Sequence, residues 1–232
     1  MNVTQPLNVR WLGRMEFAPT LELQEELVAK KRNDRLFEDQ LLLLEHEPVY
    51  TIGRTPDRSS LSARGGIDRE KLGAHLPHPL FSINRGGQAT YHGPGQLIGY
   101  PVIDLRQCGQ DLHKYLRWLE QLLIDLLASY DIAARRRQSL TGVWVENRKI
   151  ASIGVGVRHW ITMHGFALNV GGDLSPFSHI VPCGISNVAM TSLEKETKQS
   201  FSIASVARAV EKLALDSIFS LRVASETQLM NA

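Results

Sequence analysis

Three stretches of the chain carry side chains that could bind or transform a substrate. The first runs from Arg85 to Gln96 and contains four glycines and a proline where a strand would otherwise continue. Glycines let backbone amides approach a ligand closely, and Thr90, Tyr91 and His92 add hydrogen-bonding groups beside them. A structural loop with tight turns would have the same composition. The stretch is no phosphate loop of the G-x-x-x-x-G-K-[ST] kind, because no lysine closes it.

The second stretch runs from Asn147 to Gly154 and places Lys149 at the start of an apolar strand. A lysine that points inward and leaves water gives up its proton more readily, so it could act as a base. Its charge could alternatively stabilise a neighbouring thiolate. A lysine at a sheet edge usually stays solvated, and the residue pattern leaves both interpretations open.

The third stretch, His179 to Ile185, holds Cys183 between a proline and a glycine. This rigid setting with an accessible backbone would suit a nucleophile. The other cysteine, Cys108, lies in the loop-like segment Arg106 to Gly109. A free cysteine is most often an inert buried residue, and residue types alone do not choose between the two thiols.

Other chemistry has little support. The histidines His75, His78, His92, His159, His164 and His179 are scattered, and no H-E-x-x-H or G-x-S-x-G motif occurs, so we expect neither a metal nor a serine nucleophile. The run from Arg135 to Arg137 is interpreted as a solvated turn, with a docking patch for an acidic partner as the alternative.

Composition bounds the class of protein. The chain has 232 residues, 43% of them hydrophobic, and a formal charge of only +2, which argues against a bulk nucleic-acid binder. Met1 to Arg10 does not resemble a secretory signal, and the longest aliphatic run, Leu41 to Leu44, is far too short to span a membrane. We therefore expect a cytoplasmic location, no membrane association, and reduced thiols rather than a Cys108–Cys183 disulfide.

The elements that must position these stretches are helices and strands in mixed order. The clearest is a helix from Asp111 to Tyr130, with leucines at three- and four-residue spacing and Asp111 as N-cap. Further helices are expected at 19–29 and 202–221. Strands are expected at 9–12, 40–45, 49–52, 81–84, 96–103, 142–145, 149–157 and 161–170, and a loop at 54–66. This order favours one α+β or mixed α/β domain over residues 1–232, with helices on one side of the sheet and a frayed tail at 222–232.

Several motifs occur together in a defined order. They are E-H-x-P-V-[YF]-T-x-G-R at 45–54, R-G-G-x-x-T-[YF]-H-x-P-G-Q-x-x-x-Y-P at 85–101, and shorter segments at 142–144, 148–154, 164–169 and 182–184. In these motifs, across Val9 to Leu221, the sequence resembles the lipoate-protein ligase B family. This family comprises octanoyltransferases that act on acyl carrier protein.

The resemblance implies a biotin/lipoate protein ligase-like fold, in which helices pack on a mixed β-sheet, and a monomer. It implies transfer of an octanoyl group from octanoyl-acyl carrier protein, without ATP or a metal. The acceptors would be lysines on the lipoyl domains of 2-oxoacid dehydrogenases and on the glycine cleavage H protein.

The resemblance also implies roles for particular residues. Cys183 would be the acyl-thioester nucleophile, and Lys149 would favour its thiolate. The substrate-binding residues would be Arg85, Gly86, Gly87, Gln88, Ala89, Thr90, Tyr91, His92, Ser152, Ile153, Gly154, Gly165, Phe166 and Ala167. By position, Tyr91, Ile153 and Phe166 are expected to line an apolar slot for the acyl chain.

Two other functions stay open. An ATP-dependent lipoate or biotin ligase on the same fold would need no cysteine nucleophile, so the Pro-Cys-Gly context of Cys183 argues against it. A non-catalytic acyl-binding protein would not need Lys149 and Cys183 together.

Overall fold

The computed structural model describes residues 6–55, 61, 76–182 and 188–223. The predictions for Cys183, for His75 and for most of the loop at 54–66 fall outside these residues. Within the described part of the chain, no helix is both long and apolar enough to cross a membrane.

Eight of the described strands form one mixed sheet, in the order β1-β2-β6-β10-β9-β8-β7, with β11 paired to β9. The pairs β1–β2 and β9–β11 are parallel, and the remaining pairs are antiparallel. The strands in chain order are β1 (Leu7–Met15), β2 (Asp39–His46), β6 (Gln96–Val102), β7 (Ala134–Arg137), β8 (Leu140–Val145), β9 (Arg148–Arg158), β10 (Ile161–Asn169) and β11 (Ala189–Met190). The expected mixed sheet is confirmed.

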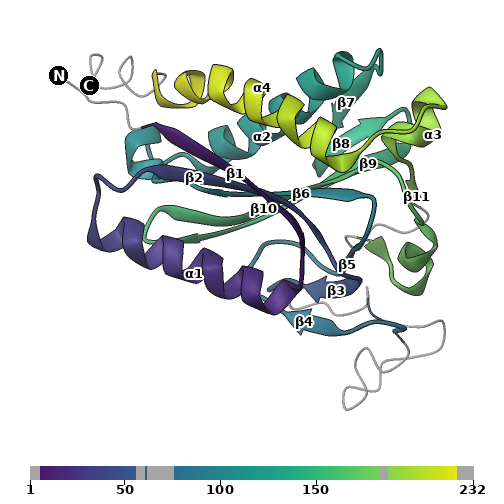
Figure 1. The fold of residues 1–232 in the computed structure, drawn as a ribbon, viewed down its shortest axis with the longest axis horizontal. Coiled ribbons are helices and arrows are strands. Elements are labelled where there is room, and N and C mark those ends of the chain that lie inside the picture. The colour runs from purple at the N-terminus through teal and green to yellow at the C-terminus, as the bar shows by residue number, and fades with distance from the viewer. Residues whose placement is uncertain (1–5, 56–60, 62–75, 183–187, 224–232) are drawn as a thin grey trace.

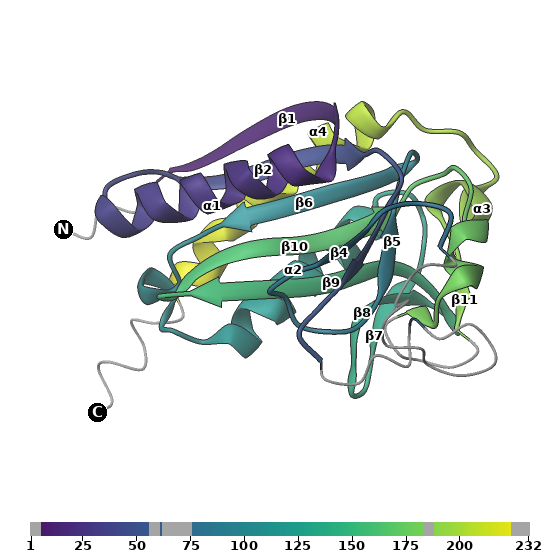
Figure 2. The same ribbon diagram turned by 90° about the horizontal axis from the view of Figure 1, so that it is seen from below.

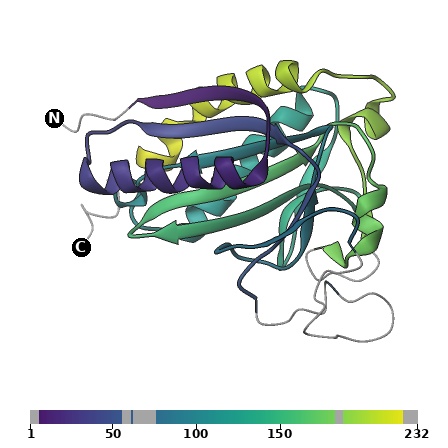
Figure 3. The same cartoon turned by 60° about the horizontal axis from the view of Figure 1, so that its bottom comes forward.

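A second, three-stranded sheet has the order β4-β3-β5, with β3 (Val49–Ile52) between β4 (Leu80–Ser82) and β5 (Thr90–His92). It lies on the same side of the large sheet as α1 (Phe17–Asn33), beyond the start of that helix (Figures 1 and 3). Phe17 joins the two, because its ring packs 5.0 Å from the ring of Phe81. The Gly-rich stretch thus includes a short strand, β5, that the sequence interpretation did not expect.

Helices cover both faces of the large sheet, so the expectation of one-sided coverage is wrong. α2 (Leu112–Ala128) and α4 (Ile203–Val223) lie on one face and α1 on the other, as Figures 1 and 2 show. Along β2, Leu41 and Leu43 belong to the core under α2 and α4, whereas Leu42 and Leu44 pack with α1. The four leucines are buried because both faces of the strand are covered.

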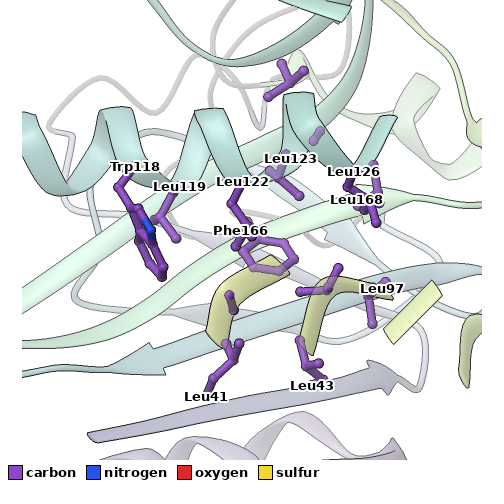
Figure 4. Packing of buried hydrophobic residues seen from close by; sticks show 14 of the residues in the cluster. Leu41, Leu43, Leu97, Trp118, Leu119, Leu122, Leu123, Leu126, Phe166 and Leu168 are labelled. Atoms are coloured by element: carbon purple, nitrogen blue, oxygen red, sulfur yellow. The ribbon is translucent and has the colours of Figure 1, made fainter. Parts of the chain in front are cut away.

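The core under α2 is built from the leucine stripe that predicted this helix. Leu119, Leu122, Leu123 and Leu126 point from α2 towards Phe166 and Leu168 of β10 (Figure 4). The predicted N-cap is confirmed, because the Asp111 side chain accepts a hydrogen bond of 2.9 Å from the Lys114 N–H. Core packing and the N-cap therefore hold α2 in place, and with it the side chains of its first turns.

Two expectations at the ends of elements are corrected. Arg135 to Arg137 is not a turn but part of the edge strand β7. There Arg136 pairs with Glu120, and the Arg137 guanidinium lies 4.9 Å from the centre of the Trp144 ring. At the C-terminus, α4 continues to Val223 and Arg222 is buried, so the frayed tail does not begin at residue 222.

A buried ion cluster joins the C-terminal ends of α1 and α4 to the start of β2. Asp39, at the start of β2, accepts from Lys31 of α1 at 3.0 Å and from Arg222 at 2.7 Å. The Asp104 N–H also points at Asp39, at 3.2 Å. Asp39 and Lys31 are fully buried, and this carboxylate stabilises both cations by contacting each of them.

We predict that Asp39→Asn lowers the free energy of unfolding by about 3–5 kcal/mol, because it removes the carboxylate that two buried cations share. Urea denaturation followed by circular dichroism measures the change. The matched control is Asp216→Asn on the exposed side of α4, which should change the value by less than about 0.5 kcal/mol. A loss below about 1 kcal/mol in the Asp39 variant would contradict the role assigned to this cluster.

Candidate active site

A cavity of about 370 Å³ lies where α2, the turn between β7 and β8, the strands β9 and β10 and the Gly-rich stretch meet. Its lining residues are Arg54, Ile83, Arg85, Gly86, Gly87, Gln88, Thr90, His92, Tyr100, Leu112, Leu116, Ser139, Leu140, Thr141, Lys149, Ser152, Ile153, Gly154, Val155, His164, Gly165, Phe166 and Ala167. A cavity of this size with mixed apolar and polar lining is typical of a small-molecule site. The structure thus brings most of the residues expected to bind substrate to one place.

The two short substrate segments expected from the sequence are cross-strand partners. Gly154 pairs with Gly165, Ile153 with Phe166, and Ser152 with Ala167 in the antiparallel β9–β10 ladder. Gly165 is required here because a Cβ on it would lie 2.2 Å from the backbone oxygen of Gly99 on β6. Two segments separated in the sequence therefore form one continuous floor of the cavity.

The Gly-rich stretch is fastened onto this floor by its own backbone and by Arg85. The Gly86 N–H donates to the Val155 carbonyl of β9 at 2.9 Å. The Arg85 guanidinium is buried and donates to the Thr51 carbonyl and hydroxyl at 3.0 and 2.9 Å, and to the Gly86 carbonyl at 3.0 Å. Arg85 thus holds the loop in place while it lines the cavity.

Ala89 and Tyr91 are the two residues between Arg85 and His92 that do not line the cavity. Both belong to a separate buried cluster, in which the Tyr91 ring packs against Tyr50 and Phe177 at 5.3 and 5.7 Å. Of the three residues expected to line an acyl slot, Ile153 and Phe166 line the cavity and Tyr91 supports its wall from behind.

Lys149 is buried, with 1% of its surface exposed, so the inward-facing interpretation is the one that the structure supports. Its ammonium lies 5.4 Å from the centre of the Trp144 ring, on the directly paired residue of β8. Gly142 makes room for it, because a Cβ there would lie 2.9 Å from Lys149 Cε and 2.7 Å from a backbone oxygen. On the other edge of β9, β11 pairs Met190 with Lys149.

The two cysteines differ in what can be said of them. Cys183 lies outside the described residues, in the segment that precedes β11 along the chain. Cys108 is a free, buried thiol in the 3-10 helix η3 (Leu105–Cys108), and burial raises its pKa to about 11. A thiol with so high a pKa is a poor nucleophile at neutral pH, which fits an inert role for Cys108.

Two hydrogen-bonded chains of polar side chains run behind the cavity wall. In one, His46 Nδ1 lies 3.0 Å from the Met15 carbonyl, and its Nε2 lies 2.8 Å from the Tyr100 hydroxyl. In the other, His92 Nδ1 lies 2.8 Å from Gln96 Oε1. Tyr100 and His92 both line the cavity, so each chain ends there.

His164 faces the cavity in a constrained conformation. It has a φ of 57° within β10, and its N–H donates to Gln24 Oε1 of α1 at 2.8 Å. Its Nε2 is buried without a hydrogen-bond partner among the described residues. A non-glycine residue held at positive φ beside an unsatisfied polar atom is typical of a functional position.

Burial keeps the histidines around the cavity uncharged. Desolvation lowers the pKa of His46 to about 4, and desolvation together with the nearby charge of Arg85 lowers the pKa of His164 to about 4. The pKa of His92 falls to about 3, chiefly because of desolvation and then because of His46. Among the described residues, no group of three or more His, Cys, Asp or Glu side chains is arranged to hold a metal ion.

Comparison with known proteins assigns this site to a family. Residues 16–213 match the family model described as the lipoyl protein ligase A/B catalytic domain. The octanoyltransferase of Geobacter sulfurreducens is 49% identical over 202 residues, which cover 86% of this chain and 79% of that protein. The chain belongs to the octanoyltransferase family. The motif resemblance is therefore confirmed, as is the inference that this chain is an acyltransferase.

Solved structures of other proteins share the fold of this octanoyltransferase family member at low sequence identity. A bipartite lipoate protein ligase solved with its E2 lipoyl domain from Thermoplasma acidophilum matches with a TM-score of 0.64 at 18% identity, over 93% of this chain and 84% of that chain. The biotin protein ligase of Aquifex aeolicus matches with a TM-score of 0.55 at 13% identity, over 95% and 72%. The expected biotin/lipoate ligase-like fold is confirmed.

Sequence reasoning missed several residues of the site. His46, Tyr100 and His164 lie within the quoted motifs, but nothing in the residue types separated them from structural positions. Leu112 and Leu116 were assigned to core packing only, and both also line the cavity. Gln24 had a usable signal, since it is a polar residue on the apolar face of its helix.

We predict that acidification destabilises the fold through these histidines. The folded-state pKa of His164 is about 4, against 6.5 in the unfolded chain, so stability is lost as the pH falls from about 6.5 towards 4. Over this range each such group contributes about 1.4 kcal/mol per pH unit. His164→Asn, which tolerates positive φ, should reduce the slope of unfolding free energy against pH by about that amount.

Urea titrations at several pH values measure this slope. The control is His159→Asn, since His159 is exposed and also has a positive φ of 52°. An identical slope in the His164 and His159 variants would contradict the prediction.

Proposed function

We propose that this protein transfers an octanoyl group from octanoyl-acyl carrier protein to a lysine of a lipoyl domain, through a thioester on Cys183. The observation that carries the proposal is a buried lysine, Lys149, in a cavity floored by the paired segments of β9 and β10. Membership of the octanoyltransferase family supports the reaction, and the lipoyl-ligase relatives support lipoyl domains as acceptors.

In the first half-reaction, the Cys183 thiolate attacks the thioester carbon of the donor. A new C–S bond forms, the donor's C–S bond breaks, and the released carrier thiolate takes a proton from the Lys149 ammonium. Exchange of one thioester for another is close to neutral in energy, so no nucleotide and no metal need to take part.

In the second half-reaction, neutral Lys149 removes one proton from the ammonium of the target lysine. The amine nitrogen then forms a C–N bond with the acyl carbon, and the C–S bond breaks with its electron pair on Cys183 Sγ. The second proton of the new amide nitrogen passes to solvent. This step restores the thiolate and the Lys149 ammonium for the next cycle.

An apolar part of the cavity wall suits the eight-carbon chain. Its side chains come from the start of α2, from β8, β9 and β10, and from the segment after β4: Ile83, Leu112, Leu116, Leu140, Ile153, Val155 and Phe166. The polar lining residues are those of the Gly-rich stretch together with Lys149, His164, Arg54, Tyr100, Ser139, Thr141 and Ser152. A chain buried against the apolar wall would leave its thioester at the polar part of the same cavity.

A thiolate nucleophile needs a reducing compartment, and we therefore propose a cytoplasmic location. Fewer arginines of the run from Arg135 to Arg137 are available to dock the acidic carrier than the sequence indicated. Arg136 pairs with Glu120, and Arg137 lies over the Trp144 ring. Arg135, the remaining residue of that run, stays exposed.

We predict that Cys183→Ser abolishes the acyl-enzyme. The wild-type chain incubated with octanoyl-acyl carrier protein should gain the mass of one octanoyl group, and the variant should gain none. Intact-mass spectrometry measures both. A stable octanoyl adduct on the variant would refute Cys183 as the nucleophile. Incorporation of free octanoate only with ATP would instead favour an adenylating ligase.

We predict that Lys149→Ala slows alkylation of Cys183 by iodoacetamide at neutral pH, because the thiolate loses its neighbouring cation. A Cys108→Ala background removes the second thiol from the measurement. The control is Lys195→Ala on α3 (Leu193–Thr197), because Lys195 does not line the cavity. A pH profile of alkylation unchanged by Lys149→Ala would remove Lys149 from this role.

A further inference from the structure

Gln96 and Asn169 each lie in one of the sequence motifs, yet the proposed chemistry uses neither. Both are buried, and they form a hydrogen-bond chain that leads from His92 to the backbone of Thr191. The Thr191 N–H in turn donates to the Lys149 carbonyl at 3.0 Å. The chain therefore connects the cavity wall with the strand that carries Lys149.

The direction of each bond in this chain follows from its last member. The Thr191 carbonyl can only accept, so Asn169 donates to it from Nδ2 at 2.9 Å and keeps Oδ1 as an acceptor. Gln96 donates from Nε2 to that oxygen at 2.9 Å, and to the Tyr91 carbonyl at 3.3 Å. Gln96 Oε1 is left to accept, so His92 must donate from Nδ1. A neutral imidazole has a single N–H, and His92 Nε2 therefore carries a lone pair.

The hydrogen-bond chain through His46 also ends in a hydrogen-bond acceptor. The Met15 carbonyl can only accept, so His46 Nδ1 is the protonated nitrogen. His46 Nε2 then accepts the proton of the Tyr100 hydroxyl. Tyr100 Oη has no proton left to donate and can only accept a further hydrogen bond. Two independent chains thus present hydrogen-bond acceptors on residues that line one cavity.

The surroundings of His92 keep its imidazole neutral, so that it offers an acceptor and does not become a cation. The titratable groups that act on it are His46, Arg85 and His164. Both of these other histidines have lowered pKa values and are neutral at pH 7, like His92 itself. The Arg85 guanidinium is occupied by Thr51 and Gly86.

The reacting groups differ in whether they can donate hydrogen bonds to these acceptors. An octanoyl chain has no hydrogen-bond donor, and a thioester carbonyl can only accept. The target lysine brings N–H donors to the acyl carbon. The neutral acceptors of His92 and Tyr100 therefore match the amine and not the acyl group.

We propose that His92 Nε2, together with Tyr100 Oη, binds the ε-amine of the acceptor lysine and orients it towards the acyl carbon. Gln96 and Asn169 are positioning residues that fix the His92 tautomer. This inference rests on the proposed function. In the transfer step His92 accepts a hydrogen bond from one N–H of the amine and is not itself protonated. The protons leave to Lys149 and to solvent as in the second half-reaction.

Two substitutions of His92 separate its two nitrogens. His92→Asn keeps an N–H donor for Gln96 but loses the acceptor in the cavity. His92→Gln loses that donor but can place an amide oxygen near the position of Nε2. Each full-length variant is loaded from octanoyl-acyl carrier protein, then mixed with an apo lipoyl domain and sampled by intact-mass spectrometry. A lipoyl domain with its target lysine replaced by arginine measures hydrolysis.

Both variants should still form the acyl-enzyme, and the discharge rate of each variant is compared with its own loading rate. His92→Asn should discharge it onto the lipoyl domain about tenfold more slowly or worse, and His92→Gln should keep most of the rate. Wild-type discharge by His92→Asn would overturn this inference and leave the proposed function standing. A wild-type chain that takes up no octanoyl group would overturn both.

Nitrogen-15 NMR of the histidine rings tests the positioning residues without turnover. In the wild type, His92 Nδ1 should be protonated and Nε2 unprotonated. Gln96→Met, which keeps the size of the side chain but removes its acceptor, should give a mixture of tautomers and a slower discharge. A wild-type spectrum with protonated Nε2 would overturn the assignment.

Discussion

The site depends on the close backbone approach of three neighbouring strands of the large sheet. Gly165 of β10 has no room for a side chain, because the Gly99 carbonyl of β6 occupies that space. The same residue pairs with Gly154 of β9, over which the backbone of the Gly-rich stretch passes. A methyl group at Gly165 would force β6 and β10 apart and shift the floor of the cavity. The register of β9 and β10 therefore sets the position of everything that lines it.

The basic group of the cavity and its neutral polar groups are different residues. Lys149 is a buried basic group beside an aromatic ring, whereas the histidines are held neutral by burial. Neutral imidazoles do not repel an incoming ammonium, and they offer hydrogen bonds whose direction is fixed by carbonyls deeper in the fold. The polar wall is thus prepared before substrate arrives, which reduces the reorganisation needed during the reaction.

The sequence predicted the fold class and eight of the eleven described strands, because hydrophobic periodicity and the motifs agree there. The short strands β5, β7 and β11 were missed. It did not predict that both faces of the sheet are covered. The inner side of α1 carries Thr20, Gln24 and Lys31, so the helix lacks a clean apolar stripe. The unbroken run from Leu41 to Leu44 was the better signal, since a strand covered on one face would alternate.

Within the site, the motifs identified which segments meet but not what each side chain does there. The burial of Lys149 depends on Gly142 of the neighbouring strand β8 and on β11, which comes from a distant part of the chain. Tyr91 lies in the middle of a motif, yet the pleat of β5 turns its ring towards Tyr50 and Phe177. Such orientations follow from strand register, which is a tertiary property.

The ion pair between Asp39 and Arg222 also bears on how the chain is made. Its partners are separated by 183 residues, nearly the length of the chain. At about 5–20 residues per second, the ribosome needs roughly 10–40 s to synthesise that interval. During this time β2 can pair with its neighbours, but the carboxylate has only Lys31 for compensation and one side of the sheet has no α4. The nascent chain therefore exposes apolar surface until α4 emerges, and this interval is when a chaperone has most to protect.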